Sequence, residues 1–576
     1  MEIYETMQIL DITKLNSVLQ DSFDVIIFNT FFTLEEKYSY QIPSNEDVSN
    51  FIEAKTQYLD NFFRILKNSG LLFIYGLPKW LPYIGNYLDS LKNDHSLMIF
   101  KYWIALALDK NEARRTLCPE HIGLLLYLKS RNRKSPSPFH LNTKKVRIPY
   151  KNCEVCGKNI KDWGGKKHLI NPLGANVSDV WRDVSRLTLN DNIIPEFILK
   201  RIYDLTEKKS FSIGYSKELS KRPLNAQDSG SSSRENPTVS TVNKPLEFKF
   251  NRVIHTDSLK YMEEISKRYP EGIFDLAFAD PPYNLAKTYS NYMDIQDARD
   301  YINWCDKWLG LMAKVIRPGG VLMVLNLPKW CIYHATFLNN ILNFRHWIVW
   351  DALSSPAGKI MPAHYAILYY TKPGGKITFN YPSDIEADSY CLRISCRKER
   401  KKIKNIKKVK VTDIWWDIHR IKHKRDRDEH PCQLPLNLMK RIIEMVTNPN
   451  DLVYDPFCGA GTTAVCAKML KRNFITTEID ENYVKIAKDN LRRLQPTLQN
   501  DYVFIRAPVK EKKISIGVPK KEIEIKFIEL CKSQKKVLTL EEVKTVNETL
   551  FKNISNYYPN FKTLKKIARR RLEMSD

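Results

Sequence analysis

Apolar runs of strand length that end at an acidic residue recur in the second half of the chain. Three such runs are residues 274–279 before Asp280, residues 452–454 before Asp455 and residues 474–477 before Glu478. Apolar residues at helical spacing follow in residues 464–470 and 483–494. Strands that alternate with helices predict a parallel α/β sheet, and the acids would lie at its carboxyl edge, where such sheets bind ligands.

Two loops at these strand ends carry the candidate chemistry. Asp280-Pro281-Pro282-Tyr283 offers a carboxylate and a carbonyl as acceptors for an amino group, beside a ring that can stack on a flat heterocycle. The segment after Asp455 contains Gly459 and Gly461, which let backbone approach a ligand closely. Glu478 follows the glycines at nearly the spacing at which an acid meets ribose hydroxyls.

These loops resemble the Asp-Pro-Pro-Tyr and cofactor loops of amino-methyltransferases, which methylate adenine N6 or cytosine N4 in DNA. The catalytic loop precedes the cofactor loop, as in the permuted beta class, and the resemblance covers roughly residues 247–495. It implies a Rossmann-like, doubly wound α/β methyltransferase sheet and S-adenosylmethionine as cofactor. The implied catalytic residues are Asp280, Pro281, Pro282 and Tyr283.

The same resemblance implies a set of cofactor-binding residues: Asp455, Pro456, Phe457, Gly459, Gly461, Thr462, Glu478 and Asp257. Aspartate in the first loop position favours adenine N6, with cytosine N4 and an RNA amino group as alternatives. A non-enzymatic nucleic-acid-binding module is the other reading, and the intact loops disfavour it. The partner implied is double-stranded DNA, while a restriction nuclease or a homodimer partner stays open.

The first half of the chain repeats the second without its chemistry. Residues 23–32 align with residues 274–283 without a gap, and Asp179–Asp183 align with Asp413–Asp417. The first copy lacks both the acid-proline loop and the glycine turn. We therefore predict that the methyltransferase fold is present twice, with a degenerate copy that binds nucleic acid, occupies a dimer partner's position or only buries a face of the active copy.

The domain organisation follows from this repeat and from changes in composition. We predict a degenerate domain at 1–206, a flexible linker at 207–246, a catalytic domain at 247–500 and a small basic helical appendage at 501–576. Within the catalytic domain, residues 373–429 are the candidate target-recognition region. Its candidate DNA-binding residues are Arg397, Lys398, Arg400, Lys401, Arg420, Lys422, Lys424 and Arg425.

A cysteine pair in the first copy is a weak zinc candidate. Cys153 and Cys156 have the two-residue spacing of zinc ligands, and Cys118 with His121 or His168 could complete a set. The second copy keeps only Cys391 and Cys396, which reduces the case for a metal there. Because zinc requires about four ligands and the first copy has one cysteine pair, the sequence favours the interpretation that no metal is bound.

The whole composition suits a polyanionic partner. The formal net charge is +26, from 91 Lys and Arg against 65 Asp and Glu, which by itself does not separate nucleic acid from an acidic membrane surface. The absence of any apolar run of 18 residues and an acidic amino terminus predict a cytoplasmic protein without a membrane anchor. Eleven scattered cysteines are expected to be mostly reduced core residues.

Overall fold

The computed structural model describes most of the chain in two compact units, residues 1–504 and 505–576. The residues described are 8–30, 45–107, 117–118, 120–133, 136, 138–160, 171–183, 194–207, 211–215, 249–285, 295–352, 359–391, 393–421, 433–496, 501–504, 520–534, 536–557, 561, 564–565 and 568–569. Within these ranges no helix is both long and apolar enough to cross a membrane.

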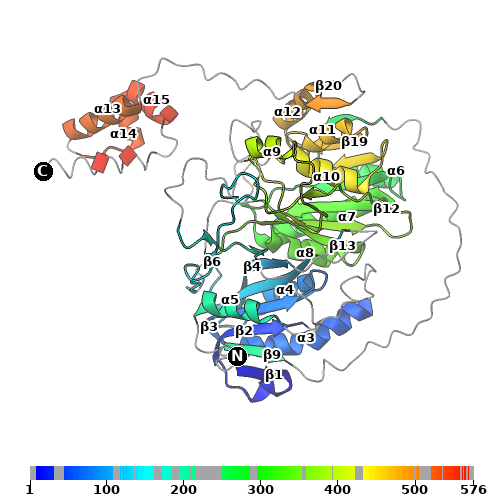
Figure 1. Ribbon diagram of the computed structural model, residues 1–576, viewed down its shortest axis with the longest axis vertical. Helices are drawn as coiled ribbons and strands as arrows, with labels where there is room; N and C mark the ends of the chain where they lie inside the picture. The colour runs from blue at the N-terminus through cyan, green and yellow to red at the C-terminus, as the bar shows by residue number, and fades with distance from the viewer. Residues whose placement is uncertain are drawn as a thin grey trace. The chain divides into compact units, whose positions relative to one another are not determined.

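The second half of the larger unit forms an eight-stranded sheet in the order β10-β19-β18-β11-β12-β14-β13-β17 (Figure 1). The strands are β10 (Arg252–His255), β11 (Phe274–Ala279), β12 (Ile316–Asn326), β13 (Asn343–Asp351), β14 (His364–Thr371), β17 (Ile414–Trp415), β18 (Leu452–Asp455) and β19 (Asn473–Glu478). β14 runs antiparallel to both neighbours, and the other pairings are parallel. The predicted doubly wound α/β sheet is therefore confirmed for this half.

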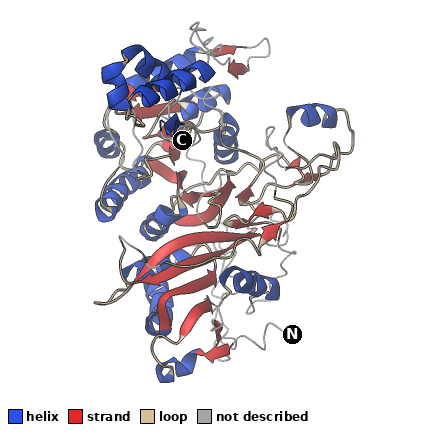
Figure 2. Ribbon diagram, turned by 90° about the vertical axis from the view of Figure 1, so that its left-hand side faces the viewer, coloured by secondary structure: helices blue, strands red, loops and turns tan. Residues whose placement is uncertain are grey.

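Helices cover both faces of this sheet, as Figure 2 shows for the strands drawn in red. One face carries α6 (Ser258–Arg268), α7 (Ala298–Val315) and α8 (Pro328–Leu338), and the other carries α10 (Leu436–Val446), α11 (Thr462–Met469) and α12 (Glu481–Arg492). Successive side chains of a strand point to opposite faces. In β11, Leu276 and Phe278 join the core under α10, α11 and α12, whereas Ala277 and Ala279 join the core under α6, α7 and α8.

The strand order reverses between β11 and β18. From β11 the chain continues through α7 to β12 on one side, and from β18 it continues through α11 to β19 on the other. β11 and β18 are themselves parallel neighbours, with Leu276 opposite Val453. Such a switch point opens a crevice at the carboxyl ends of the two strands, so Asp280 and Asp455 flank one crevice.

A seven-stranded sheet in the first half has the order β1-β9-β2-β3-β5-β4-β8. Its strands are β1 (Gln8–Asp11), β2 (Phe23–Asn29), β3 (Leu66–Gly76), β4 (Leu97–Ala107), β5 (His121–Ser130), β8 (Val180–Trp181) and β9 (Phe211–Tyr215). β2-β3-β5-β4-β8 have the same order and directions as β11-β12-β14-β13-β17. The flanking helices are η1 (Ile12–Ser17), α3 (Asn45–Ile65), α4 (Leu81–Ser90) and α5 (Glu196–Thr206).

Strand β9 corrects the predicted linker. Phe211–Tyr215 pair in parallel with β1 and β2, so this part of 207–246 belongs to the first sheet. The linker prediction relied on polar, small-residue composition, which holds for the following residues and not for the apolar alternation of this strand. The structure describes nothing between residues 216 and 248.

The two sheets share one hydrophobic core. It includes Phe28 and Leu125 from the first sheet and Phe274 and Leu368 from the second, and α4 lies against α8. Trp103 on β4 stacks on Trp347 on β13. The halves of the larger unit are therefore joined by buried apolar surface.

Smaller elements complete the chain. Three two-stranded pieces are β6 (Arg147–Ile148) with β7 (Ala175–Asn176), β15 (Ile385–Glu386) with β16 (Lys408–Val409), and β20 (Leu494–Pro496) with β21 (Tyr502–Phe504). Helix α9 (Ile394–Arg400) lies between β15 and β16 in the sequence. In the second unit, α13 (Lys520–Ser533), α14 (Leu540–Val546) and α15 (Glu548–Tyr557) enclose a core of their own.

Candidate active site

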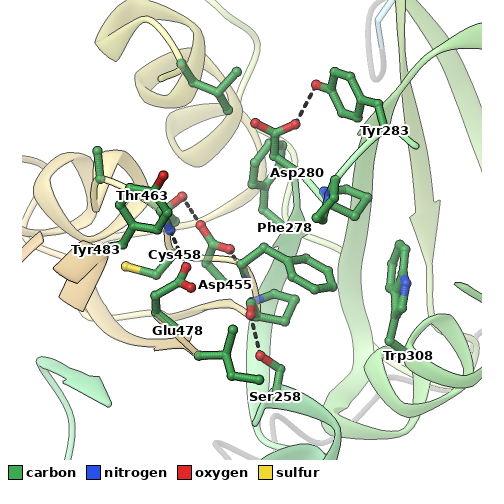
Figure 3. A pocket seen from close by; sticks show the side chains of 18 of the residues that line it. Ser258, Phe278, Asp280, Tyr283, Trp308, Asp455, Cys458, Thr463, Glu478 and Tyr483 are labelled. Atoms are coloured by element: carbon green, nitrogen blue, oxygen red, sulfur yellow. Dashed lines mark hydrogen bonds between the residues drawn. The ribbon is translucent and has the colours of Figure 1, made fainter. Parts of the chain in front are cut away.

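The first side of the crevice is the loop after β11. All six residues of β11 are buried, so the strand fixes where the loop begins. Asp280 is partly exposed at its end, and the Tyr283 hydroxyl donates a hydrogen bond of 2.5 Å to Asp280 Oδ1 (Figure 3). The two side chains that the sequence predicted to act together are therefore in contact.

Neighbouring aromatic residues hold this loop rigidly. The Tyr301 hydroxyl donates to the Pro282 carbonyl at 2.6 Å, and the Trp330 indole N–H donates to the Tyr283 carbonyl at 2.8 Å. Asn284 adopts a left-handed conformation with φ of 54°. With the two prolines limiting rotation further, the loop is ordered by contacts that leave the Asp280 side chain facing the crevice (Figure 3).

The other side is the turn after β18. The buried Asp455 carboxylate accepts hydrogen bonds from the Phe457 backbone N–H at 2.8 Å and from the Thr463 hydroxyl at 2.5 Å. Burial raises the pKa of Asp455 to about 7, and these two hydrogen bonds oppose the shift. The carboxyl group is thus poised between its neutral and charged forms at neutral pH.

Glu478, at the end of β19, is tied to the same turn. Its carboxylate accepts from the Gly459 N–H at 2.8 Å and from the Asp480 N–H at 3.0 Å. Burial raises the pKa of Glu478, while these backbone donors lower it. Gly459, with φ of +51°, brings its backbone close enough for the contact.

A cavity of about 490 Å³ connects the two sides. Its ionisable carboxyl groups come from Asp257, Asp280, Asp455 and Glu478. Among the described residues that line it, there is no lysine, arginine or histidine. In a chain with a net charge of +26, this is a local acidic site, which favours a cationic ligand.

Most of the predicted cofactor residues line this cavity, including Pro456, Phe457 and Thr462. Asp257 also lines the cavity, and it caps α6 by accepting from the Leu259 N–H at 2.8 Å. Gly461 departs from the prediction, since it is not among the lining residues. A Cβ on Gly461 would come within 2.8 Å of the Ala487 Cβ, so this glycine lets α12 approach the turn.

The sequence did not identify the aromatic wall of the cavity. Trp304 and Trp308 on α7 line it, and their rings lie 5.7 Å and 5.4 Å from that of Phe457. Ile479, which is 63% exposed, and Tyr483 line it from the other side. Trp304 and Trp308 have the i and i+4 spacing of a helix face, which by itself indicates only core packing.

Comparison with known proteins identifies the family. Residues 274–489 match the family model described as DNA methylase of the N6/N4 type. The type II methyltransferase M.BamHI of Bacillus amyloliquefaciens is 36% identical over 234 residues, which are 40% of this chain and 55% of that protein. The DNA adenine methyltransferase YhdJ of Escherichia coli K12 is 31% identical over 249 residues, 42% of this chain and 82% of that protein. The chain belongs to the N6/N4 DNA methylase family.

A solved structure of the M1.HpyAVI complex with S-adenosylmethionine is also similar to this chain, at 24% identity and a TM-score of 0.31. The similar region covers 41% of this chain and 97% of the M1.HpyAVI chain. The family model and the relative YhdJ confirm, for the second half of the chain, the resemblance predicted from the loops. The match to M.BamHI spans only about half of that protein's length.

The predicted DNA-binding residues have different environments. Arg397, Lys398 and Lys401 are exposed on or beside α9, and Arg420 is partly buried. Arg400 is buried, and its guanidinium pairs with Glu386 at 2.5 Å, so its side chain is withdrawn from any surface contact. The remaining three, Lys422, Lys424 and Arg425, lie outside the described residues.

Four cysteines meet in one cluster: Cys153, Cys156, Cys391 and Cys396. The sequence predicted different companions for the first pair. Cys118 instead bridges to Thr412, and His121 contacts Asp413, while His168 lies outside the described residues. The two pairs are more than 200 residues apart in the sequence, so only the folded arrangement reveals the set.

Proposed function

We propose that this DNA methylase transfers a methyl group from S-adenosylmethionine to the N6 amino group of adenine in double-stranded DNA. The observation that carries the proposal is the acidic cavity of a basic protein, which opens beside the Asp280–Tyr283 loop. The family membership supports methyl transfer to an exocyclic amino group, and one relative is named as a DNA adenine methyltransferase.

The cavity suits S-adenosylmethionine in charge and in shape. This cofactor carries an ammonium and a sulfonium, and when bound it supplies an electrophilic methyl group. Asp455 is the acceptor for the amino end, and Glu478 is the acceptor for ribose hydroxyls once its carboxylate leaves the backbone donors. Ile479 and Phe457 offer apolar surface to the adenine ring. A dinucleotide fits less well, because none of the described residues lining the cavity is a cation that would neutralise its phosphates.

Asp280 and Tyr283 act on the target base. Asp280 and the Pro281 carbonyl accept the two hydrogens of the exocyclic amino group, which directs the nitrogen lone pair toward the methyl donor. Tyr283 provides the surface on which the base stacks. Tyr301 and Trp330 hold the carbonyls of Pro282 and Tyr283, so they fix the backbone that follows the two acceptors before the substrate arrives. This preorganisation is where most of the rate enhancement would arise.

The target base must leave the duplex to reach this loop, since an amino group within the stack is inaccessible to the enzyme. The exposed Arg397, Lys398 and Lys401 are proposed to neutralise backbone phosphates. The aspartate in the first loop position supports adenine over cytosine. The type II relatives also support a role in protecting DNA from a restriction nuclease with the same target.

Transfer of labelled methyl from S-adenosylmethionine to mixed-sequence duplex DNA, followed by nucleoside analysis, tests this function. We expect N6-methyladenine, and digestion of the modified DNA by site-specific nucleases would map the protected sequence. N4-methylcytosine would retain the mechanism and overturn the choice of base. Label in RNA and none in DNA would overturn the substrate, and cofactor binding without transfer to either would overturn the enzymatic function.

We further propose that the first sheet is a degenerate copy that occupies the position of a dimer partner. Two bridges between the halves support this, because Cys118 pairs with Thr412 while Ser178 pairs with Met361. In the sequence repeat, Cys118 corresponds to Met361 and Ser178 to Thr412, so the contacts exchange equivalent positions, as in a two-fold interface. Monomers in solution by light scattering would agree with this role, whereas a dimer formed through the first sheet would contradict it.

A further inference from the structure

The cysteine cluster joins the two halves of the larger unit. Cys153 and Cys156 lie in the segment after β6, and Cys391 and Cys396 lie between β15 and the end of α9. The sulfur atoms form two cross-pairs, Cys153 with Cys396 and Cys156 with Cys391, each at 3.7 Å. All four sulfur atoms lie within 4.8 Å of one another.

These separations match a tetrahedral metal site. A Zn–S bond of about 2.3 Å in a regular tetrahedron places sulfur atoms about 3.8 Å apart. A disulfide requires about 2.05 Å, so the cross-pairs are too long for two disulfides. We propose that Cys153, Cys156, Cys391 and Cys396 bind one Zn²⁺ ion through four thiolates.

The backbone around the first pair is shaped for such a site. Gly157 follows Cys156 in a left-handed conformation with φ of +64°, and its N–H donates to the Cys153 carbonyl at 2.9 Å. This turn brings the two thiols to the same side. The Cys391 N–H donates to the Cys153 sulfur at 3.3 Å, which is the kind of contact that orients and stabilises a thiolate ligand.

A buried cation lies against the cluster. Four thiolates around Zn²⁺ carry a net charge of −2, and Arg400 donates to the Cys396 sulfur at 3.0 Å. The same guanidinium pairs with Glu386 on β15. Arg400 therefore has a structural place beside the proposed metal, which accounts for its burial in a segment otherwise rich in exposed cations.

The surroundings explain what the metal would do. The apolar cluster here is small, and its buried members apart from the cysteines are Ala387 and Tyr390. A core of this size contributes little stability, and small substructures commonly depend on a metal instead. With four protein ligands the site is closed, so the ion would be structural. It would fasten the Cys153 segment of the first half to α9, which carries Arg397 and Lys398.

Metal analysis of the full chain, purified without added metal, tests the proposal. We expect one zinc per chain, lost in Cys156→Ser and in Cys391→Ser, one variant from each half. Cys156→His should keep the zinc, because imidazole is also a zinc ligand and Cys156 is partly exposed. Cys531→Ser is the matched control, since this buried cysteine belongs to the second unit, and it should also keep the zinc.

Cobalt substitution supplies a readout of the ligand set. Co²⁺ bound by four thiolates gives intense sulfur-to-metal charge-transfer absorption and tetrahedral visible bands, and the charge-transfer intensity should fall in Cys156→His. Circular dichroism of each variant separates loss of metal from loss of fold. Four reactive thiols without metal, two disulfides by mass spectrometry, or iron in place of zinc would each overturn the proposal.

Discussion

Trp103 stacks face to face on Trp347, with ring centroids 3.7 Å apart and ring planes inclined by 12°. Each tryptophan follows a bulge in its strand, between Phe100 and Tyr102 in β4 and between Phe344 and His346 in β13. The two residues thus hold the same place in two sheets of the same topology. A residue that contacts its own counterpart lies on the axis relating the two copies, which supports the proposed internal dimer.

Truncating this stack should destabilise the larger unit as a whole. Both rings are almost completely buried, so Trp103→Ala and Trp347→Ala should each lower the free energy of unfolding by about 3–5 kcal/mol. Trp103→Phe, which keeps an aromatic ring, should cost less. Denaturant unfolding of the single and double variants forms a thermodynamic cycle, and additive losses would contradict direct coupling of the two rings.

Asp280→Ala should abolish methyl transfer while cofactor affinity changes little. The carboxylate lies at the end of β11, where it accepts a hydrogen bond from Tyr283 of the same loop. Loss of one preorganised acceptor should lower kcat by at least about 10²-fold. Single-turnover kinetics and calorimetric titration separate the two effects, and equal losses of both would refute the assignment.

The Tyr283 hydroxyl and its ring should contribute separately. Tyr283→Phe removes the 2.5 Å hydrogen bond to Asp280 and keeps the stacking surface. Tyr283→Leu removes the aromatic ring, and base stacking on such a ring is worth about 1–3 kcal/mol. We therefore expect the phenylalanine variant to retain most DNA affinity and the leucine variant to lose roughly 5- to 150-fold. Fluorescence of 2-aminopurine at the target position reports base flipping in both variants. Equal losses of base flipping and DNA affinity in the two variants would contradict stacking of the base on the Tyr283 ring.

The sequence predicted which residues of the candidate site lie together where these residues are close in the sequence. Asp280 with Tyr283, and Asp455 with Gly459, each lie within a few positions after an apolar strand, and the strand brings them to one edge. The crevice between them then follows from the parallel order of β11 and β18. Local pattern and a general rule of α/β topology were sufficient here.

Features made by distant segments were not predictable in this way. The cysteine cluster joins positions 153 and 396, whose proximity depends on how the two sheets pack. Gly461 looked like a ligand-binding glycine, but its neighbour is Ala487 of α12, and the sequence gives no signal of that contact. Arg400 is one cation in a basic run, and only the fold distinguishes this buried residue from its exposed neighbours.

Cofactor affinity should increase as the pH rises toward 7. Burial raises the pKa of Asp455 to about 7, so below that pH the group is mostly neutral and a poor partner for an ammonium. Affinity should therefore rise by up to about tenfold per pH unit until Asp455 is ionised. It should level off near about pH 8, where an α-amino group itself loses its proton. Asp455→Asn should bind the cofactor weakly, with an affinity that does not change with pH. Binding titrations from roughly pH 5.5 to 8, a range that spans the relevant pKa values, test this.

The same pKa has a consequence for the cofactor-free protein. The pKa of Asp455 is about 7 in the folded state and about 3.9 in the unfolded state. Between these two pH values the folded state therefore holds a proton that the unfolded state has released. The resulting stabilisation is present below about pH 4 and is lost as the pH rises through 7. Asp455→Asn should remove this part of the pH dependence of unfolding. An unchanged profile in that variant would mean that Asp455 does not titrate as assigned.

The exposed cations near α9 should contribute to DNA affinity through phosphates. Arg397→Ala, Lys398→Ala and Lys401→Ala should each weaken binding about equally for all sequences and reduce the slope of log K against log salt by about 1. Arg492→Ala is a matched control, because this exposed cation on α12 already pairs with Asp489 at 2.6 Å. Fluorescence anisotropy at several salt concentrations measures the slopes. Loss of affinity for one sequence only, with an unchanged slope, would instead indicate base readout by these side chains.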